Sequence, residues 1–150
     1  MADHSVQALT RCEIATVPCA AVIDLIDRHP RIGRAIWIET LIQASTYREW
    51  ILNVGRRAAR ERIAHILCEF ARRLEIAGLG TTHGYRFPLT QEQLADSTGL
   101  TSVHVNRTLK SLEEDKLIVR HKRFVEIPNW ERLRDMSGFG ELYLHLDQMA

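Results

Sequence analysis

Two predicted helices between Leu89 and Leu109, joined by a three-residue turn that contains Gly99, set the architecture of this chain. Helices that cross at a steep angle need a small residue where they touch, and Ala95 supplies it. The turn needs a residue that tolerates a positive φ, and Gly99 supplies that. Apolar residues recur at helical spacing on the inner face of the second helix: Leu100, Val105, Leu109 and Leu112. This spacing predicts a helix-turn-helix whose second helix is offered to the DNA major groove.

The outer face of the second helix carries Ser102, Val103, Asn106, Arg107 and Lys110. The guanidinium fork of Arg107 can bind guanine O6 and N7 bidentately. Ser102 and Val103 lie near the N-terminal end of the helix, where side chains approach base edges. We therefore predict base readout by Ser102, Val103 and Arg107, with a solvated surface arginine as the alternative for Arg107.

A second group of residues is suited to phosphate oxygens. Hydroxyl groups at helix N-termini, together with backbone N–H groups, bind anionic oxygens, and cations add attraction that is independent of base sequence. Thr90 also begins a capping-box pattern that Gln93 completes. The predicted phosphate contacts are Thr90, Thr101, Lys110, His121, Lys122 and Arg123. For each of them, a plain exposed residue is the alternative.

Charge is unevenly distributed along the chain. The formal net charge is only +1, but residues 101–125 contain six Lys/Arg against three acids, and residues 126–150 contain two against five. This asymmetry favours a localised phosphate-facing surface over a uniformly basic protein. The seven histidines and other polar residues show no recognisable catalytic spacing and there is no phosphate-binding glycine loop, so we do not expect an enzyme.

Composition is that of an ordinary globular protein, with 45% hydrophobic and 26% charged residues in 150. The cysteines Cys12, Cys19 and Cys68 are unclustered, which favours a reducing cytoplasm and buried, inert thiols. No apolar run approaches the ~20 residues of a membrane span, and no signal-peptide core is present. We therefore expect a soluble, cytoplasmic protein that has no membrane partner.

The N-terminal third is predicted to contain a strand over 4–17, a short helix over 20–28 and a long helix over 30–54. This chain offers the strand no partner, so we expect it to belong to a sheet from missing sequence or to pair with another copy. The long helix is apolar on nearly every side between Ala35 and Ala44, so it needs two partners. One face is predicted to pair with a second copy in a homodimer. The expected interface residues are Ile38, Leu41, Ile42, Ser45 and Leu52. The alternative is the central helix of a compact bundle.

The remaining segments complete a small domain around the two helices. A helix over 58–77, ended by Gly78 and Gly80, precedes a short strand over 85–89 in which Pro88 suggests an edge position. Residues 117–127 are predicted to form two strands about a basic tip, the wing of a winged helix. Asn129 is expected to cap a last helix, and an apolar segment over 142–146 closes the chain.

Several stretches together resemble the C-terminal half of bacterial transcription regulators of the Crp/Fnr family. They are Arg62–Leu67, Leu89–Ala95, Gly99–Thr101, Val105–Leu109 and Leu117–Ile118. The resemblance extends back to residue 4 and implies a mainly α fold with a small β component. Residues 1–55 would be a remnant of the sensory β-roll, a connecting helix and the long dimerisation helix. Residues 56–150 would be the winged helix-turn-helix domain that binds DNA.

The resemblance also implies ligands and partners. Because the Gly-rich, Arg-containing cassette for a cyclic nucleotide and the cysteine cluster for an iron–sulfur centre are missing, we expect no cofactor and no metal. Double-stranded DNA bearing an inverted repeat is the expected partner, and RNA polymerase is a further partner that the resemblance allows. Valine stands at position 103 where the best-known family pattern has glutamate, which leaves the half-site sequence open. A winged-helix module for protein–protein assembly is the alternative function.

Overall fold

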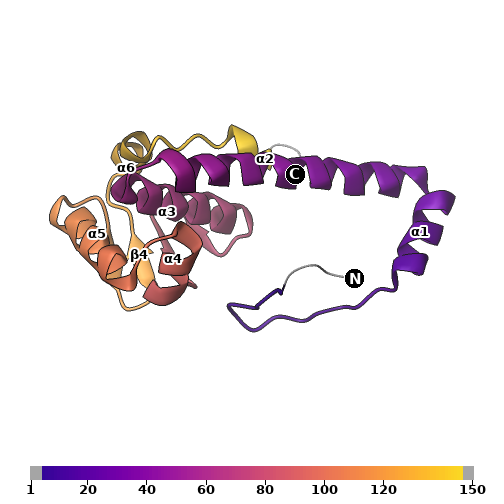
Figure 1. Cartoon of the computed structure of the whole chain (residues 1–150), viewed down its shortest axis with the longest axis horizontal. Helices are drawn as coiled ribbons and strands as arrows, with labels where there is room; N and C mark the ends of the chain where they lie inside the picture. Colours follow the sequence, from indigo (N-terminus) through magenta and orange to yellow (C-terminus); the bar gives the residue numbers. More distant parts are fainter. Residues whose placement is uncertain (1–4, 147–150) are drawn as a thin grey trace.

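The long helix α2 (Pro30–Arg56) is the axis of the computed structural model, which describes residues 5–146. Figure 1 shows α1 at one end of α2 and the winged domain gathered around the other. The other helices are α1 (Cys19–Arg28), α3 (Ala59–Ile76), α4 (Gln91–Thr98), α5 (Ser102–Glu114), α6 (Trp130–Ser137) and the 3-10 turn η1 (Leu142–Leu144). The predicted fold class, mainly α with a small β component and a winged helix-turn-helix, is confirmed. None of the helices in the described part of the chain is long and apolar enough to cross a membrane.

Four short antiparallel strands form one sheet in the order β1-β2-β4-β3. They are β1 (Gly80–Thr81), β2 (Gly84–Arg86), β3 (Val119–His121) and β4 (Phe124–Glu126). The predicted wing is the β3–β4 hairpin, in which His121 pairs with Phe124 and leaves Lys122 and Arg123 at the tip. The predicted strand over 85–89 was wrong in two respects. It is not an edge strand, because β2 pairs with both β1 and β4, and it does not contain Pro88, which lies beyond the end of β2.

Gly80 belongs to β1 and does not end α3 as expected. It pairs with Tyr85, and a Cβ atom at this glycine would come within 2.6 Å of the Tyr85 Cβ atom. Glycine is therefore needed here for the close approach of two strands. Gly78, with φ of 69°, is the residue that ends α3, and the Leu79 N–H donates to the Leu74 carbonyl in the usual way for such a terminus.

The core of the winged domain is built on α3. Ile63 and Leu67 on this helix are fully buried, as are Val105 and Leu112 on the inner face of α5. The buried Tyr85 hydroxyl donates to the Leu67 carbonyl at 2.7 Å and ties β2 to α3. The same cluster holds residues from α3, α4, α5 and the wing, so these elements share one packed core.

The N-terminal segment departs from the prediction. Residues 5–18 form no strand and run as an exposed, open stretch, while His4 lies outside the described residues. The physical reason is that an isolated strand leaves its backbone groups without a pairing partner. The prediction of buried thiols was also wrong for Cys12 and Cys19, which are exposed. It holds for Cys68, whose pKa burial raises to about 12.

The bundle alternative for the long helix is not what the structure forms. Large apolar side chains stay exposed along α2, including Trp37 at 67% and Ile51 at 71%. Only Ile42, Thr46 and Asn53 are buried on this helix, and they lie on one face. The rest of α2 therefore presents apolar surface to its surroundings.

Candidate nucleic-acid interface

The two helices of the helix-turn-helix are fixed by local signals in the sequence. The Thr90 hydroxyl accepts from the Gln93 N–H at 3.1 Å, and the Gln93 side chain accepts from the Thr90 N–H at 2.9 Å, so the capping box is confirmed. Gly99 ends α4 with φ of 64° and a left-handed conformation. Thr101 caps α5 by accepting from the His104 N–H at 3.2 Å. Three residues separate the helices, as expected.

These constraints turn one face of α5 outward. Val105, Leu109 and Leu112 are buried, whereas Ser102, Val103, Arg107 and Lys110 are exposed. Val103 is 80% exposed, so its apolar side chain is accessible on this face. The three predicted base-reading residues thus lie together on an accessible surface.

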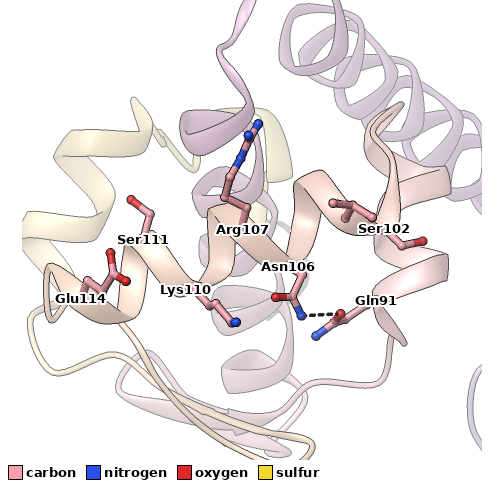
Figure 2. Close-up of a pocket in the computed structure, with 8 residues that line it drawn as sticks. Gln91, Ser102, Asn106, Arg107, Lys110, Ser111 and Glu114 are labelled. Carbon is pink, nitrogen blue, oxygen red and sulfur yellow. Dashed lines mark hydrogen bonds between the residues drawn. The ribbon is translucent and has the colours of Figure 1, made fainter.

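An open groove runs along this surface (Figure 2). Its lining residues are Gln91, Ser102, Val103, Asn106, Arg107, Lys110, Ser111 and Glu114. We call this the α5 groove. It contains all three predicted base-reading residues and Lys110, and it adds Gln91, Asn106 and Glu114, which sequence reasoning had not included in the site.

Gln91 and Asn106 are joined by a hydrogen bond. The Asn106 Nδ2 donates to the Gln91 Oε1 at 3.0 Å, which links the first turn of α4 to the outer face of α5 (Figure 2). This bond leaves the side-chain carbonyl oxygen of Asn106 and the side-chain NH₂ group of Gln91 available for other partners. Asparagine and glutamine amides pair with adenine N6 and N7, so this pair is chemically suited to base edges.

A second groove lies between the start of α4 and the wing. It is lined by Thr90, Lys122 and Arg123 together with Arg120 and several core residues. The structure therefore brings together three of the six predicted phosphate contacts. Lys110 lines the α5 groove instead, and the exposed Thr101 and His121 line neither groove.

Two of the three acids in the basic segment are paired. The Arg120 guanidinium donates to the Glu113 carboxylate at 2.6 Å, and this bond holds the pKa of Glu113 below its usual value. Arg60 on α3 pairs with Asp115 just beyond α5. Glu114 also lines the α5 groove, and its negative charge partly offsets the positive charge that Lys110 brings there. Arg120 thus serves the attachment of α5 to β3 and contributes less free positive charge than the sequence count suggested.

Hydrogen bonds from α3 also fix the position of the helix-turn-helix. The Arg62 guanidinium on α3 donates to the Thr98 carbonyl at 2.7 Å, at the end of α4, and to the Arg57 carbonyl at 3.0 Å. The fully buried Asn53 of α2 donates to the Arg62 carbonyl at 3.5 Å. Arg62 therefore connects the long helix to the turn that precedes α5.

The residues predicted for the dimer interface lie along one side of α2. Ile38, Leu41 and Leu52 are 38%, 55% and 49% exposed, and Ser45 is half-buried. Ile42 is 9% exposed, so the chain itself already buries most of this side chain. Exposed apolar groups at helical spacing are what a helix-to-helix contact needs.

Comparison with known proteins settles the family. The Crp-like helix-turn-helix domain matches residues 61–136, a region that contains α4, α5 and the wing. The chain belongs to the Crp/Fnr family of transcription regulators. Membership of this family also confirms that the chain is not an enzyme.

Individual Crp/Fnr relatives match over most of this chain. The transcriptional activator protein FnrL of Cereibacter sphaeroides is 34% identical over 119 residues, which cover 77% of this chain and 48% of the relative. The nitrogen fixation regulation protein FixK of Azorhizobium caulinodans is 27% identical over 140 residues, which cover 92% and 54%. The chain therefore spans about half the length of the relatives it matches.

A solved Crp/Fnr-type structure has the same fold. FixK2 from Bradyrhizobium japonicum superposes with a TM-score of 0.72 at 23% identity, over 81% of this chain and 59% of that one. A putative regulator of the crp/fnr family from Eubacterium rectale superposes with a TM-score of 0.54 at 16% identity, over 77% and 50%. At these identities the agreement concerns the fold alone.

Proposed function

We propose that this Crp/Fnr protein is a sequence-specific DNA-binding regulator that acts as a homodimer on an inverted repeat. The observation that carries the proposal is the exposed α5 groove, which holds Ser102, Val103 and Arg107 beside a wing tipped by Lys122 and Arg123. In this arrangement the groove reads base edges while the wing contacts the backbone. The protein would act in the cytoplasm, where its DNA is, and RNA polymerase would be a further partner.

Base readout would divide between two kinds of side chain. The Arg107 guanidinium suits guanine, at about 1–3 kcal/mol of discrimination per bidentate pair. The exposed Val103 side chain offers only an apolar face and suits a thymine methyl group. Thr90, Thr101, Lys110, His121, Lys122 and Arg123 would contact phosphates, with strength that falls steeply as salt rises.

Dimerisation would use the exposed apolar side of α2. Ile38, Leu41 and Leu52, with Ser45 and the remaining edge of Ile42, would meet the same residues of a second copy. We infer two functional units, residues 1–55 for dimerisation and residues 56–150 for DNA binding. Two-fold pairing would set the recognition helices about 34 Å apart, one turn of DNA.

Selection of binding sites from a random duplex library tests this proposal. The expected result is enrichment of inverted repeats whose half-site centres are separated by about one helical turn. Recovery of asymmetric single half-sites would contradict the dimer. A lack of DNA affinity at low salt would contradict the whole proposal and favour a winged-helix module for protein–protein assembly.

A further inference from the structure

The C-terminal segment from Phe139 to Leu146 packs into the joint between the long helix and the winged domain. After α6 it runs back along α2, and η1 lies against that helix (Figure 1). Leu144 in this turn is 1% exposed and belongs to the domain core. Only Arg57 and Ala58 separate α2 from α3, so the covalent connection alone is a short hinge. Packing by a third segment on both sides of a hinge restricts its rotation.

Tyr143 is the polar centre of this packing. Its hydroxyl donates to the Glu69 Oε2 at 2.8 Å and lies 3.2 Å from the His65 Nε2. Because the hydroxyl proton goes to Glu69, the oxygen is free to accept from the His65 Nε2–H. The Tyr143 ring stacks on the His65 ring with a centroid distance of 5.9 Å and an interplanar angle of 16°. Both His65 and Glu69 are buried residues of α3.

Glu49 of α2 lies beside this cluster. The Glu49 Oε1 lies 3.7 Å from the His65 Nε2 and accepts from Arg57 at 2.6 Å. Arg57 also donates to the Gly138 carbonyl at 3.4 Å, just beyond α6. Two sets of hydrogen bonds thus hold this joint: Tyr143 bonds to α3, and Arg57 bonds both to Glu49 of α2 and to Gly138 beyond α6, while the neutral His65 ring lies between the two sets. Hydrogen bonds in such surroundings are directional and strengthened by the low dielectric, so they favour one relative orientation.

We propose that Tyr143 is a positioning residue that fixes the angle between α2 and the winged domain. In a dimer that pairs through α2, this angle determines the separation of the two α5 helices, so Tyr143 sets which half-site spacing is bound. This consequence rests on the proposed function, whereas the angle itself does not. Tyr143 does not line the α5 groove, so its proposed role is separate from base contact.

Distance measurement between spin labels tests the angle without DNA. Labels at Glu39→Cys on α2 and Asp96→Cys on α4, in a Cys12→Ser, Cys19→Ser background and diluted with unlabelled protein, report one intramolecular distance. Tyr143→Phe, which removes only the hydroxyl, is expected to broaden this distribution. Tyr85→Phe is the matched control because it removes a buried hydroxyl that bonds within the winged domain, and it should keep the wild-type width.

An unchanged distribution in Tyr143→Phe would overturn the proposal, as would equal broadening in Tyr85→Phe. If Tyr143→Phe does not fold, Arg57→Gln opens the same joint from a partly exposed position. That variant must then broaden the distribution, and a wild-type width would overturn the proposal.

Binding to duplexes tests the consequence for DNA. On selected inverted repeats lengthened or shortened by one base pair, Tyr143→Phe should lose several-fold of the wild-type spacing preference. Its affinity for a single half-site should stay within about twofold of wild type, because the α5 groove is intact. An equal loss on single and paired half-sites would identify a merely structural role. If wild-type protein itself had no spacing preference, the proposed function would fail while the label distances still judged Tyr143.

Discussion

The Asn106 Nδ2 donates to the Gln91 Oε1 across 3.0 Å and couples the recognition helix to the first residue of α4. This bond lies in the exposed α5 groove, which Arg107 also lines. A helix-surface amide that is held by a neighbour loses less rotamer freedom when it meets a base. We therefore expect the pair to act as one preorganised element of base readout.

Replacing either member of this pair should alter readout at the same base pair. We expect Gln91→Ala and Asn106→Ala each to reduce discrimination there, with a coupling of about 0.5–3 kcal/mol in a double-mutant cycle because they share one hydrogen bond. Affinities for the selected duplex and its single-base variants measure this. Glu92→Gln, at the exposed neighbour of Gln91, is the control and should leave readout unchanged. Additive effects of the two alanine variants would contradict the coupling.

Substitutions at Arg107 and at Lys122 should affect DNA binding in different ways. Arg107→Ala is expected to cost about 1–3 kcal/mol on the selected site and to relax its specificity, because one bidentate base contact is lost. Lys122→Ala at the wing tip should weaken binding evenly across sequences and reduce the salt slope by about 1. Shift assays over a salt series distinguish the two. If neither variant changes DNA affinity at low salt, this surface does not bind DNA.

His65 should make stability depend on acid pH. Burial, reinforced by the nearby Arg57 charge, lowers the pKa of His65 from an ordinary value near 6.5 to about 3. Between pH 6.5 and pH 3, His65 is therefore protonated in the unfolded chain but remains neutral in the folded chain. The contribution of His65 to the free energy of unfolding is fully present above pH 6.5 and is lost as the pH falls toward 3. We expect a loss of about 2 kcal/mol between pH 7 and pH 5.

Denaturant unfolding at the two pH values measures that loss. His65→Gln should flatten the pH dependence by about this amount, whatever its effect on stability at pH 7. His104→Gln, on the surface of α5, is the matched control and should keep the wild-type slope. An unchanged slope in His65→Gln would mean that other groups cause the acid sensitivity.

Two of the three thiols should react quickly in the folded protein and the third should not. Cys12 and Cys19 are exposed, whereas burial raises the pKa of Cys68 to about 12 and leaves it without thiolate at neutral pH. We expect Ellman's reagent to modify Cys12 and Cys19 in the native protein and Cys68 only after unfolding. Removing Cys12 and Cys19 should abolish the fast reaction, and fast modification of Cys68 would contradict its burial.

Local chemistry explains what the sequence could predict. The capping box at Thr90, the glycine at 99 and the apolar spacing of α5 are short-range signals, and they predicted α4 and α5. The wing was predicted from another local signal, the two short strand patterns on either side of the basic residues at its tip. Contacts between distant residues have no such signal. The bond between Gln91 and Asn106 spans fifteen positions, and that between Tyr143 and Glu69 spans seventy-four. Residues 5–18 form no strand in the single chain, because alternation of side chains does not supply the partner strand that the prediction placed outside it.

We propose that two chains, paired through α2, bind one inverted-repeat duplex. Sedimentation equilibrium of the protein with the selected duplex tests it most directly, with Leu41→Asp as the variant that charges the exposed α2 surface. We expect two wild-type chains per duplex. Without DNA, at micromolar concentration, the wild-type protein should have twice the mass of one chain, and Leu41→Asp should dissociate into single chains. A single chain per inverted-repeat duplex, with a monomer in the absence of DNA, would contradict it.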